Sequence, residues 1–200
     1  MVSDLSAEQV VPLLRGRLGN PYRFVETCAS TQRLLADGDP EGTVAVADEQ
    51  TAGRGRLGRR WLAPGGRALL CSILLRPVPP LPCWPELSLV AGDAVAAAIR
   101  EQTGVDAVLS HPNDVLVAGR KLVGVLAEAR PGRVVLGIGV NVNQRADELP
   151  AGTAKPATSL RVELGHSLPR APLLAAILLE LEHHYDEWQA LHARTVQRVR

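Results

Sequence analysis

The sequence predicts an α+β domain in which helices flank a mixed, mostly antiparallel sheet. Three apolar segments, residues 114–119, 120–130 and 133–143, follow one another in the middle of the chain and indicate consecutive strands. Helical patterns lie before and after this group and do not alternate with each strand, which argues against a βαβ fold. The 200 residues, of which 46% are hydrophobic, can bury one substantial core, so we expect a single domain.

The first part of the chain mixes helical and extended patterns. Apolar residues recur at helical spacing near the amino terminus, and Ser30 and Thr31 stand where a helix N-cap is favoured. Alternating or continuous apolar runs further on indicate strands. The elements expected here are a helix at 5–18, a strand at 22–26, a short helix at 32–36, and strands at 43–50 and 68–75.

Prolines and glycines divide the rest of the chain. Gly104 ends a clear helical pattern, and Pro131 with Gly132 forms a turn between the last two central strands. The closing segment has an amphipathic helical pattern. The remaining elements are expected as a surface crossing at 77–85, a helix at 86–104, a polar loop at 144–157 and a helix at 172–193.

Charge and cysteine usage restrict the class of protein. The formal net charge is only +1, so no global basic field favours non-specific nucleic-acid binding. Cys28, Cys71 and Cys83 are scattered and lack CxxC spacing, which disfavours a disulfide framework or a zinc site. The amino terminus lacks a signal-peptide pattern, and the longest apolar run, 68–75, is too short to cross a bilayer. We expect a cytoplasmic protein without a membrane partner.

The segment ADEQTAGRGRLGRRW, residues 47–61, contains a GxGxxG pattern that begins at Gly53. A dinucleotide site would need a helix after the third glycine, but a proline and two more glycines follow within two turns. It would also need an acidic residue for the ribose, and none occurs between Glu49 and Glu86. These observations disfavour a dinucleotide site.

The same segment concentrates positive charge. Arg54, Arg56, Arg59 and Arg60 lie within seven residues and would repel one another unless an anion neutralised them. Such a run can also be a solvated basic turn that binds nothing. Because glycines between the arginines permit a loop to close over a ligand, we favour an anionic ligand.

Two further groups of polar residues interrupt apolar strands. Asn113 and Asp114 lie in a turn at the entrance of a strand, and Lys121 lies inside the next one. Lys121 could be a snorkelling edge residue, or a point charge directed at a phosphate. Asn141 and Asn143 stand beside glycines that a bulge alone could explain; we expect the asparagines to line a pocket and recognise a flat polar group.

Taken in order, ETCASTQ, GRGRLGRRW, PND, GRKLVGVL, GIGVNVN and ATSL make the chain similar to the biotin protein ligases, which attach biotin to carrier domains of carboxylases. The resemblance covers nearly the whole chain and implies a fold like that of class II aminoacyl-tRNA synthetases. It also implies a two-step reaction. The biotin carboxylate attacks the α-phosphate of ATP to give biotinyl-5'-AMP and pyrophosphate, and a carrier lysine then attacks this mixed anhydride and releases AMP. Mg²⁺ is implied as a cofactor.

The resemblance also implies residue roles. Lys121 would bridge the biotin carboxylate and the α-phosphate, Arg56 would cover the reacting groups, and Asp114 would orient or deprotonate the incoming lysine. The residues implied to bind biotin are Ser30, Thr31, Gln32, Gln50, Arg54, Gly55, Arg56 and Lys121. Those implied to bind ATP are Arg56, Arg59, Trp61, Asn113, Lys121 and Asn141. No residue is expected to ligate a metal.

Two features depart from the family's usual pattern. Lys-Trp usually precedes the Pro-Asn-Asp turn, whereas this chain has Ser110 and His111, and we expect the change to slow transfer to the carrier more than adenylate formation. The family usually adds a small SH3-like C-terminal domain, and its bifunctional members an N-terminal helix-turn-helix. We expect residues 1–200 to form a single catalytic domain lacking both, hence a monofunctional ligase without a nucleic-acid partner.

Other functions remain open from the sequence alone. A lipoate or octanoate ligase would share the fold but lack the GRGRLGRRW loop. A degenerate paralogue would bind biotin or its adenylate without efficient transfer, which the changes at Ser110 and His111 would fit. The partner that the resemblance implies is the biotin carboxyl carrier domain of acyl-CoA or pyruvate carboxylases, and the oligomeric state is left open.

Overall fold

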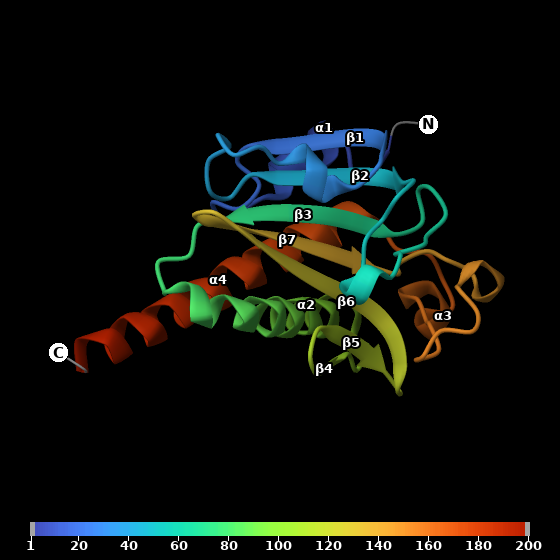
Figure 1. Cartoon of the computed structure of the whole chain (residues 1–200). Coiled ribbons are helices and arrows are strands. Elements are labelled where there is room, and N and C mark those ends of the chain that lie inside the picture. Colours follow the sequence, from blue (N-terminus) through green and yellow to red (C-terminus); the bar gives the residue numbers. More distant parts are fainter. Residues whose placement is uncertain (1–2, 199–200) are drawn as a thin grey trace.

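The computed structural model describes residues 3–198 and contains a seven-stranded sheet with the order β1-β2-β3-β7-β6-β5-β4 (Figure 1). β1 and β2 are parallel, and the other neighbouring strands are antiparallel, which confirms the predicted mixed sheet. The strands are β1 (Tyr22–Cys28), β2 (Val44–Gln50), β3 (Leu69–Leu75), β4 (Val108–Ser110), β5 (Asp114–Val117), β6 (Arg120–Arg130) and β7 (Arg133–Val140).

Two long helices, α2 (Leu87–Thr103) and α4 (Arg170–Arg198), cover one face of this sheet (Figure 1). α2 ends at Gly104 in the left-handed conformation, as its sequence predicts. No helix among the described residues is both long enough and apolar enough to span a bilayer. The shorter helical elements are α1 (Ala7–Val10), α3 (Leu160–Leu164), and the 3-10 turns η1 (Val11–Leu13), η2 (Thr31–Leu34), η3 (Arg56–Gly58), η4 (Leu81–Glu86) and η5 (Ala146–Glu148).

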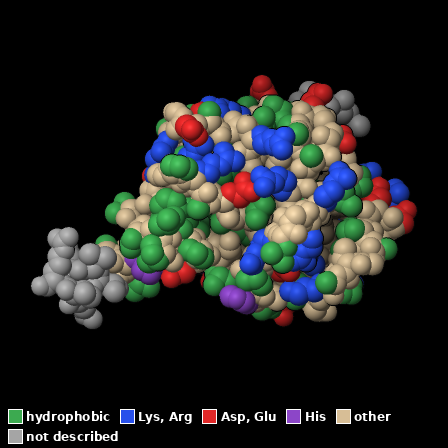
Figure 2. Space-filling model, in the orientation of Figure 1, with side chains coloured by type: hydrophobic (Ala, Val, Ile, Leu, Met, Phe, Trp, Pro, Cys, Tyr) green, Lys and Arg blue, Asp and Glu red, His purple; other side chains and the backbone are tan. Residues whose placement is uncertain are grey.

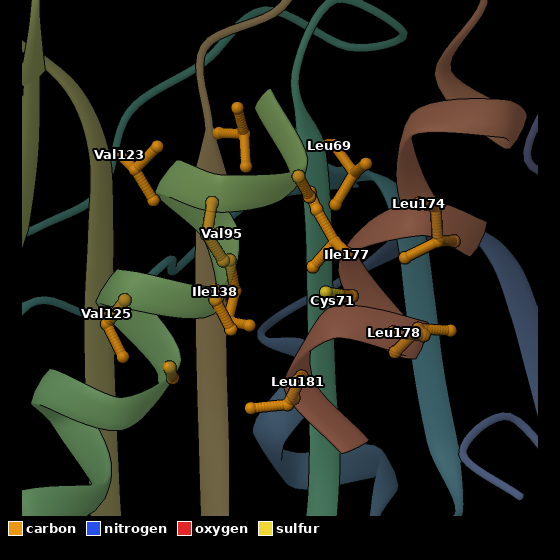
Figure 3. Packing of buried hydrophobic residues seen from close by; sticks show 14 of the residues in the cluster. Leu69, Cys71, Val95, Val123, Val125, Ile138, Leu174, Ile177, Leu178 and Leu181 are labelled. Atoms are coloured by element: carbon orange, nitrogen blue, oxygen red, sulfur yellow. The ribbon is translucent and has the colours of Figure 1, made fainter. Parts of the chain in front are cut away.

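The hydrophobic core lies between the two long helices and the sheet. Figure 3 shows Val95 of α2 and Ile177 of α4 among apolar side chains of the strands, including Cys71 of β3 and Ile138 of β7. Because side chains alternate along a strand, the residues between these core positions face the other side of the sheet. That second face carries the candidate site.

Two helix predictions at the amino end are wrong in extent. The helix expected at 5–18 ends at Val10, because Pro12 lies in a 3-10 turn and the chain becomes extended at Leu14. The short helix expected at 32–36 is the 3-10 turn η2. Ser30 occupies its cap position without a side-chain capping hydrogen bond. The Thr31 hydroxyl contacts β3 through Ser72, 2.7 Å away, so tertiary contacts replace the expected cap.

The other differences concern short elements. The last central strand ends at Val140 instead of residue 143, because the backbone of the next residues bonds to the start of α3 and to Arg67. The sequence analysis predicted neither β4 nor α3, since elements of three and five residues are too short for a clear periodic pattern. α3 does carry a start signal, because the Ser159 hydroxyl accepts a hydrogen bond from the Val162 amide at 3.1 Å.

A buried arginine joins the start of α4 to the amino-terminal segment and to β2. The Arg170 guanidinium lies 2.5 Å from Asp4 and 2.8 Å from Asp48, and it donates to the Ala68 carbonyl at 2.9 Å. Only 4% of Arg170 is exposed. Removing one member of such a cluster leaves buried charges uncompensated.

We therefore expect Arg170→Met to lower the free energy of unfolding by about 2–4 kcal/mol, the scale for a broken buried ion pair, measured by urea denaturation. Arg145→Met is the matched control, because Arg145 pairs with Asp147 at the surface. It should leave the denaturation midpoint unchanged. Equal midpoints for the two variants would contradict a structural role for Arg170.

Candidate active site

A cavity of about 760 Å³ lies against the sheet on the side away from the helical core. Ser72, Gly137 and Gly139 line it, and they alternate along β3 and β7 with the core residues Cys71 and Ile138. Its volume suits a small organic ligand. The sheet therefore buries an apolar layer on one side and builds a ligand-sized site on the other.

Glycines in the cavity floor allow large side chains to lie flat on the sheet. Gly124 of β6 pairs with Gly139 of β7. A Cβ on Gly139 would come within 2.6 Å of the Trp61 ring, and one on Gly124 within 2.8 Å. A Cβ on Gly137 would lie 3.1 Å from the Gln32 amide. These glycines are thus required for close approach of side chains, and a bulge is not needed to explain them.

One end of the cavity is polar and uncharged. The Thr31 amide donates to Gln50 Oε1 at 2.8 Å, and the Thr31 hydroxyl lies 2.7 Å from the Ser72 hydroxyl. Gln32 donates to the Leu126 carbonyl at 3.2 Å, while its own Oε1 is buried without a partner. An unpaired buried acceptor favours a ligand that supplies a donor. Ser72, which the sequence analysis did not select, was recognisable as the polar residue inside the apolar run LLCSILL.

At the other end, a β-bulge directs Lys121 into the cavity. Val115 pairs with Val123, but Leu116 pairs with Lys121, so β6 has one extra residue at Leu122. Both Leu122 and Val123 are buried in the core, and the bulge turns Lys121 to the same side as the glycine floor. Lys121 is therefore not a snorkelling edge residue.

The Lys121 ammonium contacts the Asp114 carboxylate at 2.7 Å, and the Lys155 ammonium contacts its second oxygen at 3.1 Å. Burial by itself would raise the pKa of Asp114, but hydrogen bonds and charge attraction from Lys121 and Lys155 outweigh it and hold this pKa below its usual value. Asp114 is therefore an ionised carboxylate at neutral pH. The sequence analysis did not select Lys155, which comes from the loop after β7.

The arginine segment forms a tight hairpin over the cavity. Arg54 and Arg60 form an antiparallel bridge, and the Gly55 amide donates to the Arg59 carbonyl at 2.7 Å. Arg54 pairs with Glu128 at 2.8 Å, whereas the Arg56 guanidinium donates to the neutral side-chain oxygen of Asn113 at 3.3 Å. Among the described residues, Arg56, Arg59 and Arg60 have no carboxylate partner within ion-pair distance. Figure 2 shows basic side chains gathered on this face.

The two asparagines after β7 are held by protein partners. The Asn141 amide donates to the Thr158 carbonyl at 3.0 Å and accepts from Gln144 at 2.8 Å, although the residue lines the cavity. Asn143 binds both backbone groups of Leu168 and lies outside the cavity lining. The expectation that Asn143 lines the pocket is therefore wrong, because its side chain fixes the loop that leads into α4. A contact of Asn141 with adenine stays a prediction.

The structure brings all the residues to which the resemblance assigns a binding or catalytic role to this one cavity. They come from β2, β5, β6, η2, the arginine hairpin and the end of β7, and they are Ser30, Thr31, Gln32, Gln50, Arg54, Gly55, Arg56, Arg59, Trp61, Asn113, Asp114, Lys121 and Asn141. The residues that sequence reasoning missed include Ser72, Gly124 and Lys155. One cavity with a neutral polar end and a cationic end can hold a ligand that has both kinds of group.

Comparison with known proteins agrees with this arrangement. The Biotin/lipoate A/B protein ligase family matches residues 24–144. A bifunctional ligase/repressor BirA of Bacillus spizizenii is 38% identical over 180 residues, and a biotin--[acetyl-CoA-carboxylase] ligase of Mycobacterium tuberculosis is 38% identical over 184 residues. Each match covers 86% of this chain, but only 55% of the first relative and 67% of the second. The chain thus spans little more than half the length of the BirA relative.

Solved structures show the same fold. The biotin protein ligase from Aquifex aeolicus in complex with biotin and ATP has a TM-score of 0.74 at 33% identity, over 84% of this chain and 72% of that chain. The Leishmania major ligase in complex with biotinyl-5-AMP has a TM-score of 0.70 at 27% identity, over 88% of this chain and 80% of that chain. By family match, identity and fold, the chain belongs to the biotin/lipoate A/B protein ligase family.

Proposed function

We propose that this chain attaches biotin to a lysine of a biotin carboxyl carrier domain, using ATP and passing through biotinyl-5'-AMP. The observation that carries the proposal is that the neutral polar end and the cationic end of the one cavity meet at Lys121. Biotin has a polar uncharged ring at one end and a carboxylate at the other, and ATP brings the phosphates that unpaired arginines would bind. Ligands named for similar ligases, biotin with ATP and biotinyl-5-AMP, support the same assignment.

In the first step, a biotin carboxylate oxygen attacks the α-phosphorus, and the bond to pyrophosphate breaks. Both reactants are anionic, so a cation between them lowers their repulsion as they approach. We assign this role to Lys121, with Arg56 covering the phosphate from the hairpin. For Lys121 to act, its ammonium turns from Asp114 to the ligand anions, a change made easier because Asp114 keeps a second lysine partner.

In the second step, the amine of the carrier lysine attacks the acyl carbon, and AMP leaves as the acyl–phosphate bond breaks. Asp114 lies beside Lys121 and faces the same cavity. A carboxylate with a lowered pKa is a weak base. We therefore propose that Asp114 orients the amine by accepting a hydrogen bond from it, and that the proton released on amide formation passes to the leaving phosphate or to water.

The residues of the cavity do not form a protein site for Mg²⁺. Asp114 is the only acidic residue among the described residues that line the cavity, and both of its oxygens are paired with lysines. Mg²⁺ prefers oxygen ligands and keeps several waters. Mg²⁺ would therefore enter as part of the nucleotide substrate, bound to its triphosphate, and we derive no step from it.

The alternatives fit this cavity less well. A lipoate or octanoate tail has no uncharged polar ring, so it would leave the Gln32 acceptor and the Thr31–Ser72 pair without a ligand partner. A paralogue that only binds would not need Lys121 and Asp114, to which we assign the two chemical steps, at one point of the cavity. We propose carriers of acyl-CoA or pyruvate carboxylases as partners, and a cytoplasmic location, which the free thiols Cys28, Cys71 and Cys83 fit.

We expect Lys121→Ala to retain measurable biotin binding but to lower biotin-dependent ATP–pyrophosphate exchange by at least about a hundredfold, the scale for one preorganised charge at a developing anion. Arg120→Ala is the matched control. Arg120 adjoins Lys121 but pairs with Glu163 and lies outside the cavity lining, so exchange should be near normal. Near-normal exchange by Lys121→Ala would remove Lys121 from the mechanism.

A second variant tests the hairpin. Arg56→Gly should still form the adenylate but release it, because the guanidinium that covers the phosphate is lost. Mass spectrometry should then detect biotin on lysines of an added unrelated protein such as albumin. Arg56→Lys keeps the positive charge and serves as the control, with labelling restricted to the carrier. Adenylate formation by Arg56→Gly without any labelling beyond the carrier would reject this role of Arg56.

A further inference from the structure

Lys155 brings a cation into the site from the loop between β7 and α3, two residues before the ATSL motif. Its ammonium lies 3.1 Å from Asp114 Oδ2 and 3.2 Å from the Ser110 hydroxyl, and the residue lines the cavity. The surrounding backbone is fixed to β6. The Lys121 amide donates to the Pro156 carbonyl at 2.7 Å, and the Thr158 amide donates to the Lys121 carbonyl at 2.9 Å. These bonds direct Lys155 and Lys121 to the same carboxylate.

Lysine is rare in this chain and occurs only at positions 121 and 155. Of the 22 Lys and Arg residues, only Lys121 and Lys155 are lysines. Both contact Asp114, one at each oxygen. A lysine presents a compact point charge on a flexible stem, whereas an arginine presents a rigid planar fork. A chain that otherwise uses arginine thus places its two compact cations on a single carboxylate.

Lys155 also lies beside a position at which the resemblance to biotin protein ligases implies a cation that this chain lacks. Ser110 stands where the resemblance leads us to expect a lysine, and it pairs with Asp114 across the β4–β5 hairpin. The Lys155 ammonium lies against this serine. The charge that position 110 lacks is therefore present, delivered by the loop between β7 and α3.

We propose that Lys155 is a positioning residue for the transfer step, replacing a cation at position 110. It holds Asp114 in place when Lys121 turns to the ligand anions, so that Asp114 can orient the carrier amine. This inference rests on the proposed ligase function. It also changes the expectation that Ser110 slows transfer to the carrier, because Lys155 supplies the positive charge that Ser110 lacks.

The test compares the two half-reactions in Lys155→Met, which removes the charge and keeps the length of the side chain. Biotin transfer to the purified carrier domain of an acetyl-CoA carboxylase should fall about 10- to 100-fold in kcat/KM, as expected for losing a charged hydrogen bond. Biotin-dependent ATP–pyrophosphate exchange should change by less than about threefold, since Lys121 remains. Equal losses in both half-reactions would contradict a role in transfer.

Two further measurements separate positioning from a structural role. Ser110→Lys in the Lys155→Met background should restore most of the transfer rate, because it returns a cation to the same carboxylate. The charged groups facing Asp114 are Lys121 of β6 and Lys155 of the loop, and His111 lines the same cavity. Removing Lys155 takes away a cation that lowers the Asp114 pKa, so the acidic limb of the transfer rate should move to higher pH.

The outcomes also distinguish a failure of the role proposed for Lys155 from a failure of the proposed ligase function. No biotin-dependent exchange by the unmodified chain would reject the ligase function itself. Normal exchange with unchanged transfer in Lys155→Met would reject the role of Lys155 alone. Biotin found on Lys155 by mass spectrometry after incubation with biotin and ATP would also overturn it, because Lys155 would then be an acceptor amine and not a positioning cation.

Discussion

The placement of Lys121 beside Asp114 is the constraint on which the site depends, and a β-bulge creates it. With regular alternation along β6, Lys121 would share a face with Val123 and point into the helical core, where an ammonium would be strongly disfavoured. The extra residue at Leu122 turns Lys121 to the cavity instead. Asp114 begins the neighbouring strand and receives it at 2.7 Å. The fold thus positions a positive charge where the neutral end of the cavity meets its cationic end.

The distribution of charge around Lys121 makes the two ends of the cavity different. At one end, Thr31 bonds to both Gln50 and Ser72, and none of the three carries a charge. At the other, Arg56, Arg59 and Arg60, which have no carboxylate partner among the described residues, lie around the same cavity as Lys121. Cations held close together in a partly buried site favour an anionic ligand. The loop that looks like a dinucleotide fingerprint forms a bridged hairpin with a 3-10 turn and, within the described residues, no directly following helix, so its glycines do not build a dinucleotide site.

Long periodic segments made much of the fold predictable. The central strands and the helix ending at Gly104 follow from local patterns, whereas Pro12 breaks a helix that periodicity alone extends to residue 18. The site was harder to predict, because its members come from many separate elements and only the resemblance placed them together. Lys155 lies just before the ATSL motif in a segment with no periodic pattern, although the presence of only two lysines in the chain was a usable signal. Asn143 shows the opposite error, because it was predicted to line the pocket but its side chain instead binds the backbone of Leu168.

The most direct test of the account is the dependence of ATP–pyrophosphate exchange on the acid supplied, measured with the unmodified chain and radiolabelled pyrophosphate. The account predicts exchange with biotin and little with octanoate or lipoate, because the neutral end of the cavity presents an unpaired acceptor and a hydroxyl pair to a polar ring. Exchange supported equally by octanoate, or absent with every acid, would contradict it.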